Sequence, residues 1–336
     1  MANPSNTAMY SHRSQFWLKN VTTGSQAAID RVQSVEPMFN IRSDAYYEVG
    51  RKGKIGTTQH PPEYRVTAEQ NLINSMEAEF LLAGKSIAPV GAQSYNLGDI
   101  LTYSSLITAY VLNRNQNDTI LDEQEYTGCS VSELQWRFTM GGAITQSISL
   151  IGQQGRLYTA ANVIHGAWGA LDNTSLGGIH GKDARIWFTS GSVATTRAYR
   201  LQNFTIRAAF PAVYVRELGN RTLVGTLSDV PEVTVDFDLL LSDDQPTEKF
   251  FTLQTTYYDY QNPLAAFNAY VRVFDPRDTE GITTVKMFRI ENVLPVTHTP
   301  IRAQVRGLAT ARYSLVMSAE STADSGGLII SNRNDL

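Results

Sequence analysis

Apolar and polar residues alternate with a period of two in several stretches of the chain. The clearest are residues 64–72, 143–151, 233–241 and 308–317. This period is typical of a strand with one buried face and one wetter face. For residues 143–151 we expect Ile144, Ile148 and Leu150 to point inward and Thr145, Ser147 and Ser149 to point outward.

One short segment has a helical rather than a strand pattern. Asn74 or Ser75 can cap a helix through the run MEAEFLLAG, which ends at Gly84. We expect about one such helix in each half of the chain, beside mostly antiparallel strands.

The chain also repeats itself. A shift of 169 positions (217 minus 48) places YYEVGRKGKIGTTQHPPEYRV on VRELGNRTLVGTLSDVPEVTV and matches Glu48 with Glu217, Gly50 with Gly219, Pro62 with Pro231 and Val66 with Val235. Further along the shift becomes 160 (269 minus 109), and then 165 (307 minus 142), with the order kept. Trp17 also loosely matches Trp187. The pattern indicates a tandem duplication with changes in loop length.

The repeat predicts the organisation of the chain. We expect an N-terminal arm at 1–15, a first domain at 16–165, a connecting segment at 166–184, a second domain at 185–320 and a C-terminal tail at 321–336. Gly50, Gly56, Gly219 and Gly225 bracket short segments between extended runs, which is typical of turns that need unusual backbone angles. About nine extra residues near 75–108 in the first half are expected on the outside or at a contact between assemblies.

Composition narrows the function. Of the 336 residues, 42% are apolar and 18% are charged, and the net charge of −4 gives no reason to expect tight duplex binding. The chain has no apolar run of 18 residues and no signal-peptide pattern, so we expect neither membrane insertion nor secretion. A single cysteine, Cys129, excludes internal disulfides, and we expect it to be a small core residue.

No residue pattern predicts catalysis. The histidines lack metal-site spacing, the run LGGIHGKD fails as a phosphate loop, and the acidic cluster around Asp236 and Asp238 is more typical of a solvated face than of a glycosidase. We therefore expect no enzyme activity, no cofactor and no metal.

The two halves resemble the tube domain of the tail tube proteins of long-tailed bacteriophages. The resemblance rests on residues 47–67 and 215–236, where an E-[VL]-G segment, a glycine turn and Pro-Glu precede a strand, and on the late strands at 128–152 and 293–317. It implies a mainly β fold with minor α content, built as two tandem β-sandwich domains, each with a flanking helix.

The same resemblance implies a structural virion protein. Most relatives have one domain and form hexameric rings, so a chain with two should form trimeric, pseudo-hexameric rings that stack into a hollow tube in the virion tail. The implied partners are other copies of the chain, the tape measure protein, the tail terminator, distal tail or baseplate proteins, a sheath if the tail contracts, and genomic DNA in transit. Assembly is expected in the host cytoplasm.

Two groups of residues are candidate sites. A channel for DNA should lack fixed cations that pair with phosphates, so Glu69, Asp236 and Asp238 are predicted to line the lumen, with outer solvent as the alternative. The resemblance implies that the turns reach a neighbouring subunit or ring, with solvated hairpins as the alternative. The basic first turn is predicted to pair electrostatically with the acidic second turn across rings. The residues of the two turns are Gly50, Arg51, Lys52, Lys54, Gly56, Pro62, Gly219, Arg221, Gly225, Asp229 and Pro231.

Two other readings remain open. One is a sugar-binding or hydrolytic β-sandwich on a virion, and the other is a tail terminator or distal tail protein that forms a single ring.

Overall fold

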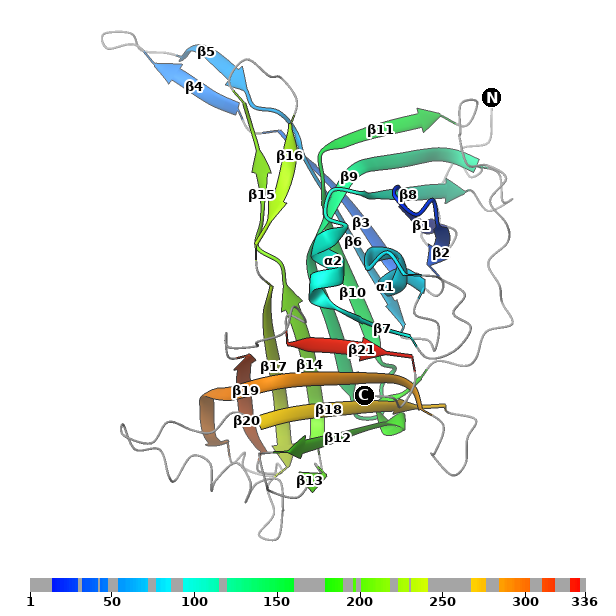
Figure 1. Ribbon diagram of the computed structural model, residues 1–336. Coiled ribbons are helices and arrows are strands. Elements are labelled where there is room, and N and C mark those ends of the chain that lie inside the picture. The colour runs from blue at the N-terminus through cyan, green and yellow to red at the C-terminus, as the bar shows by residue number, and fades with distance from the viewer. Residues whose placement is uncertain are drawn as a thin grey trace, which may run out of the picture.

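The computed structural model is mainly β with few helices, as the sequence predicts (Figure 1). It describes residues 14–29, 32–41, 43–47, 54–71, 77–85, 93–114, 120–159, 179–189, 196–197, 201–217, 223–229, 231–240, 267–275, 284–302, 310–317 and 327–332.

The first half of the chain contains two short helices, α1 (Glu77–Leu82) and α2 (Leu97–Thr102). Its strands are β1 (Gln15–Asn20), β2 (Gln26–Ile29), β3 (Val32–Asn40), β4 (Ser43–Tyr47), β5 (Lys54–Gln59), β6 (Glu63–Asn71), β7 (Ser94–Asn96), β8 (Ile107–Arg114), β9 (Ile120–Thr139), β10 (Thr145–Gly152) and β11 (Gln154–Thr159). One sheet runs in the order β3, β6, β10, β9, and a second runs in the order β2, β1, β8, β9, β11. The long strand β9 belongs to both sheets.

The second half begins with a short 3-10 turn at Gly181–Asp183. Its strands are β12 (Ala184–Thr189), β13 (Thr196–Arg197), β14 (Leu201–Ala209), β15 (Ala212–Val215), β16 (Gly225–Ser228), β17 (Glu232–Leu240), β18 (Phe267–Phe274), β19 (Thr284–Arg302), β20 (Thr310–Met317) and β21 (Leu328–Ser331). The strand order is β14, β17, β20, β19, continuing through β18 and β12 to β13, with β21 also on β19. All of these pairings are antiparallel, as they are in the first half.

The two halves therefore share one strand plan. The pairing extends to single residues: Trp17 lies opposite Tyr110, and Trp187 lies opposite Tyr270. A bulge interrupts β9 between the partners of Ser149 and Leu150, and a bulge interrupts β19 between the partners of Ser314 and Leu315. These positions match under the shift of 165 found in the sequence. Because bulges are specific features of a fold, the shared bulge shows that these strands of the two halves are equivalent in structure.

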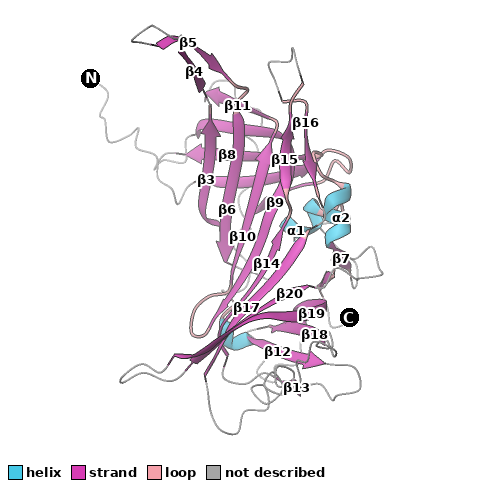
Figure 2. Ribbon diagram, turned by 90° about the vertical axis from the view of Figure 1, so that its left-hand side faces the viewer, coloured by secondary structure: helices cyan, strands magenta, loops and turns pink. Residues whose placement is uncertain are grey.

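The halves join edge to edge. Strand β14 pairs with the C-terminal part of β9, residues 203–209 against 133–139, so β3, β6, β10, β9, β14, β17 and β20 form one continuous sheet. Figure 2 shows most of these strands side by side. The pairing of β9 with β14 repeats no other pairing in either half, because it is the junction between them.

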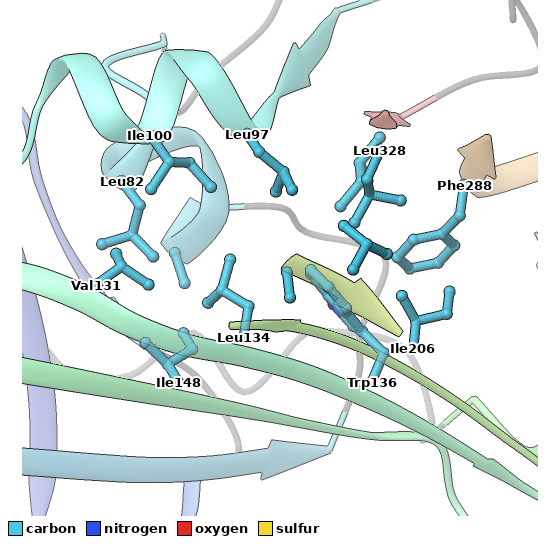
Figure 3. Close-up of a cluster of buried hydrophobic side chains, with 14 of the residues drawn as sticks. Leu82, Leu97, Ile100, Val131, Leu134, Trp136, Ile148, Ile206, Phe288 and Leu328 are labelled. Atoms are coloured by element: carbon cyan, nitrogen blue, oxygen red, sulfur yellow. The ribbon is translucent and has the colours of Figure 1, made fainter. Parts of the chain in front are cut away.

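A second pairing also crosses between the halves. Strand β7 of the first half pairs with β21 of the second half, with Tyr95 opposite Ile330. The helices beside β7 contribute Leu82, Leu97 and Ile100 to the core, where Leu328 and Phe288 of the second half approach them over Leu134 and Trp136 (Figure 3). One hydrophobic core therefore continues across the junction.

The predicted helix and its end are confirmed. Helix α1 spans Glu77–Leu82, and Gly84 adopts a φ of 64°, the left-handed conformation that favours glycine after a helix. A Cβ at this position would also lie 2.1 Å from the ring of Tyr103, so a larger residue would clash. The short helix α2 was not predicted; Asn96 and Asp99 cap its start reciprocally. The part of the second half that corresponds to α1 lies outside the described residues.

In the described part of residues 75–108 an outer position is wrong, whereas the alternative, a contact between assemblies, stays a prediction; residues 86–92 lie outside the described residues. Phe80, Leu81, Leu82 and Leu97 are buried, and β7 lies in the junction between the halves. Burial in this region follows the helical period over a short run, and the comparison of the two halves does not detect it. That comparison showed only that the first half is longer here.

The expectation for the glycines is also wrong at two positions. Gly56 lies inside β5 opposite Tyr46, and Gly225 opens β16 opposite Val215. Neither has a positive φ, and a Cβ would meet nothing at Gly56 within 4 Å. Gly50 and Gly219 lie outside the described residues. The turns themselves form as hairpins, β4 with β5 and β15 with β16.

Parts of the predicted termini and linker are visible. Strand β1 begins at Gln15, where the predicted arm ends. The predicted C-terminal tail contains β21, whose Leu328 and Ile330 are buried, so this part of the tail belongs to the core. Most of the predicted connecting segment lies outside the described residues.

Candidate assembly surfaces

The strand β14 shows what the junction buries. Its side chains that point to the core are fully covered, because β14 has β17 on one side and β9 on the other. These residues are Phe204, Ile206 and Ala208, and Phe210, directly after the strand, is buried with them. Phe210 also donates its backbone N–H to the carbonyl oxygen of Ser132, which extends the ladder beyond the strand.

The strand β3 occupies the same place in the first half but is an edge. Within the described residues it pairs with β6 alone. Under the shift of 169, Phe39 corresponds to Ala208 and Ile41 to Phe210; Phe39 is 58% exposed and Ile41 is 44% exposed, whereas Phe210 is 2% exposed. Apolar side chains that one half buries at the junction are therefore open to solvent at the equivalent edge of the other half.

The opposite end of the continuous sheet is a second open edge. Beyond Val293, β19 pairs with β20 on one side, and no described strand lies on its other side. This part of β19 corresponds to the part of β9 that holds β14. The molecule therefore carries the two complementary edges of the junction, one at each end.

Both open edges carry prolines. Pro37 lies in β3, and Pro295 and Pro300 lie in β19. Proline lacks a backbone N–H, so it weakens pairing at an edge and is tolerated there. A pairing between these edges would be specified by a limited number of ladder hydrogen bonds together with the apolar side chains of β3.

A buried ion pair holds the two halves together. Lys286 on β19 places its Nζ 2.5 and 2.6 Å from the carboxylate oxygens of Glu79 on α1. The indole N–H of Trp136 and the side-chain amide of Gln146 also donate to Glu79 Oε1, each at 2.9 Å. Both charged side chains are essentially inaccessible to solvent. Burial lowers the pKa of Lys286, and the carboxylate of Glu79 opposes this effect.

This ion pair was not predicted from the sequence. A signal existed in the run Val285–Phe288, where a lysine interrupts an otherwise apolar stretch, but nothing in the sequence identified its partner 207 positions away.

The hairpin β15–β16 lies against the first half. The hydroxyl of Tyr214 donates to the carbonyl oxygen of Tyr64 at 2.7 Å, and Arg216 forms an ion pair with Glu63. Thr226 meets the hydroxyls of Ser105 and Ser130. The hairpin β4–β5 projects beyond the body of the molecule (Figure 1).

The predicted loop residues are only partly described. Gly50, Arg51, Lys52, Gly219 and Arg221 lie outside the described residues. Lys54 begins β5, Pro62 precedes β6, Pro231 is buried, and Asp229 is exposed after β16. The predicted electrostatic pairing of the two loops across rings stays a prediction.

The three predicted lumen acids lie on one face of the continuous sheet. Glu69 alternates with the buried residues Ala68 and Gln70 on β6, and Asp236 and Asp238 alternate with buried residues on β17. Cross-strand partners link Glu69 through Ser147, Gln135 and Arg207 to Thr234, which precedes Asp236 by two positions. We call this surface, opposite the core, the polar face.

The polar face is not free of cations. Its arginines, on β6, β9, β14 and β20, are Arg65, Arg137, Arg207 and Arg312. Arg207 forms an ion pair with Glu133 at 2.8 Å, and Asn203 donates to Asp238 at 3.1 Å. The surface is therefore mixed in charge and rich in Ser and Thr rather than uniformly acidic.

The described residues contain no group of His, Cys, Asp and Glu arranged to hold a metal ion, and no helix among them is long and apolar enough to cross a membrane. Cys129 is fully buried, as predicted, and burial raises the pKa of its thiol to about 12. A thiol so deeply protonated is a poor nucleophile.

Comparisons with known proteins gave structural likenesses alone. No family model matches the chain, and no curated protein matches it. Among solved structures, a chain of the anti-feeding prophage baseplate is 12% identical, with a TM-score of 0.30, and the match covers 39% of this chain and 86% of the other. A chain of the anti-feeding prophage tube-terminating cap is 13% identical, with a TM-score of 0.32, and the match covers 45% of this chain and 95% of the other.

Proposed function

We propose that the protein is a structural virion protein, the major tail tube protein of a long-tailed bacteriophage. Three chains close a ring of six similar domains, and the rings stack into a hollow tube that conducts the genome during infection. The chain carries no catalytic role in this proposal.

The observation that supports this proposal is the junction between β9 and β14. This junction is an interface between two similar domains. Strand β3, at one end of the continuous sheet, is equivalent to β14, and the part of β19 beyond Val293, at the other end, is equivalent to the part of β9 that pairs with β14. An interface whose two sides lie on opposite ends of a unit is heterologous, and it generates a closed ring when the rotation per unit divides the circle.

Energetics favour closure. Open strand edges tend to pair with other chains, and a closed ring removes them. Covering Phe39 and Ile41 would add burial of apolar surface at about 25 cal/mol per Å². The number of chains follows from the family resemblance, in which six domains form a ring, and from the two similar halves of this chain.

The edge of β3 provides a direct test. In the free chain Phe39 and Ile41 are exposed, so Phe39→Asp with Ile41→Asp should leave the fold intact while placing charges in the proposed interface. We expect this variant to remain a folded single chain that forms no rings or tubes in negative-stain electron micrographs.

The control is Val21→Asp, which introduces one aspartate, where the β3 variant introduces two, at an exposed apolar residue in the turn after β1. It should assemble like the unmodified protein. If the β3 variant forms normal tubes, the proposal fails. Single rings from the unmodified protein would favour a terminator or distal tail protein, and monodisperse particles with a sugar-binding cleft would favour the carbohydrate reading.

We propose further that the polar face lines the channel. Its support is the continuous row of Ser, Thr and Gln residues, with acids at Glu69, Asp236 and Asp238, that runs across both halves. Of the four arginines on this face, Arg207 forms an ion pair with Glu133, which lowers its pull on passing phosphates, and Arg312 lies opposite Asp238.

Charge reversal tests the channel. Asp236→Lys with Asp238→Lys should leave tube length and diameter unchanged but reduce DNA delivery by assembled virions, because fixed cations in the wall would retain phosphates. The control, Lys19→Asp on β1, changes charge away from the polar face. Unchanged delivery by the double variant would contradict the assignment.

The remaining parts of the proposal concern partners. We propose that the tube encloses the tape measure protein before DNA passes, that it ends on a tail terminator and on distal tail or baseplate proteins, and that rings contact through the hairpins. DNA passes without specific binding, which agrees with the net charge of −4.

A further inference from the structure

Strands β11 and β21 hold equivalent places in the two halves. Strand β11 pairs with the N-terminal part of β9, with Leu157 opposite Gln124. Strand β21 pairs with the N-terminal part of β19, with Ile330 opposite Phe288. The bulged residues are Ser132 in β9 and Val296 in β19. Gln124 and Phe288 precede them by the same number of positions (132 minus 124 equals 296 minus 288). Leu157 therefore corresponds to Ile330.

The two strands differ in what covers their second edge. Strand β21 is covered by β7 of the first half, and Ile330 is 0% exposed. Among the described residues, no strand covers the second edge of β11, and Leu157 is 66% exposed. The apolar side chain at this position is thus buried in the second half, where β7 covers the strand, and exposed in the first half, where no described strand does.

The open edge has the chemistry of an unfinished sheet. An exposed strand edge presents unpaired N–H and C=O groups, and proteins normally block such an edge or pair it. Strand β11 contains no proline, and Leu157 places an apolar side chain on it. These features favour pairing of the β11 edge with an added strand over its exposure to solvent.

We propose that β11 is completed by a strand from a second copy of this chain, in the way that β7 completes β21. This inference rests on the proposed function, and it adds a second contact to the ring. In the described junction, the first half contributes both β9, which pairs with β14, and β7, which pairs with β21. By analogy, the neighbour that completes β11 is the chain whose β19 pairs with β3.

Hydrogen–deuterium exchange of the whole chain, free and assembled, tests the inference. In the assembled protein we expect the amides of residues 154–159 to exchange at least tenfold more slowly than in the free chain, together with those of residues 32–40. If residues 32–40 become protected and residues 154–159 do not, the inference is wrong and the proposed ring stands. If neither segment becomes protected, both fail.

A variant gives an independent measurement. Leu157→Asp should fold normally, because the side chain is exposed, and should raise the protein concentration needed for assembly at least tenfold. Leu157→Ile should assemble normally, and Val21→Asp is the control for an added charge. Normal assembly of Leu157→Asp would overturn the inference, even if Phe39→Asp with Ile41→Asp blocks assembly.

Discussion

At the scale of single residues, the most unusual feature is the ion pair of Glu79 and Lys286. Removing two charges from water costs several kcal/mol, and the mutual attraction repays this only when geometry and hydrogen bonding are good. Here the carboxylate receives Lys286, Trp136 and Gln146 together. The cluster therefore fixes the position of α1 against β19 rather than adding simple stability.

Breaking one side of the pair should be costly. We expect Lys286→Met alone to lower the free energy of unfolding by about 3–5 kcal/mol, because it leaves the buried carboxylate of Glu79 without its countercharge. Adding Glu79→Gln should restore most of the loss, since the amide oxygen still accepts a hydrogen bond from Trp136 or Gln146. Urea unfolding of the free chain measures both.

The matched control for this cycle is the solvent-exposed pair Arg207 and Glu133, where Arg207→Met should change the free energy of unfolding by about 1 kcal/mol or less. A double variant as unstable as Lys286→Met alone would contradict this account of the buried pair.

Cys129 predicts a defined alkaline behaviour. Its pKa is raised from 9.0 to about 12 by burial, so the folded chain keeps the thiol proton to higher pH than the unfolded chain does. This contribution to stability is complete below about pH 9 and is lost as the pH rises towards 12, at about 1.4 kcal/mol per pH unit. In Cys129→Ala the contribution is absent, so the stability difference between the two proteins should shrink between pH 9 and 11.

Other groups titrate in the same range, and two of them, Tyr126 and Tyr214, also respond to the charge on Cys129. Burial also raises the pKa of Tyr126 and of Tyr214 to about 12, and both tyrosines are present in each protein. A difference in the free energy of unfolding that stays constant from pH 8 to pH 11 would show that Cys129 does not titrate in this way.

At the scale of elements, strands could be predicted because burial on one face imposes a period of two. The stretches at 64–72 and 233–241 became β6 and β17, and Ile148 and Leu150 are buried between outward-facing Ser147 and Ser149, as predicted. The repeat located equivalent strands, but the pairing of β9 with β14 and of β7 with β21 could not be predicted, because pairing between distant strands leaves no local pattern.

Hairpins were predicted as turns without their docking partners. Tyr214 is a conspicuous case, since its hydroxyl reaches the backbone of Tyr64 across 150 positions. Sequence reasoning also assigned strained backbone to Gly56 and Gly225, whereas the glycines with positive φ are elsewhere, at Gly84 and Gly128 among others. A match between repeats shows that positions correspond, and it does not show why a glycine is there.

The docking of the hairpin β15–β16 is testable at this scale. Tyr214→Phe removes its hydrogen bond to Tyr64 and should lower the free energy of unfolding by about 1 kcal/mol. Amides of residues 212–217 and 223–228 should then exchange faster than in the unmodified chain, while those of β4–β5 should not change. Equal acceleration in both hairpins would mean that the effect is global and not a loss of docking.

At the scale of the whole molecule, the central proposal is that the chain supplies two adjacent units of a larger ring. Its halves share strand order, bulge position and cross-strand partners, and they meet through edges that recur unpaired at the two ends of the continuous sheet. One chain thus contains one complete interface, β9 with β14, and the two strand edges, β3 and β19, from which the proposed interface between chains would form.

This arrangement also explains why the molecule has open apolar positions. Phe39, Ile41 and Leu157 are exposed where their counterparts, Ala208, Phe210 and Ile330, are buried. In the proposed ring every such position is covered once, by a neighbouring copy of the chain.

The symmetry of the assembled particle tests the central claim most directly. Electron cryomicroscopy of the purified, assembled protein should show rings of three chains with sixfold-like density, in which the β3 edge of one chain lies beside β19 of the next. Rings of six whole chains, or a protein that stays a single chain at high concentration, would contradict it.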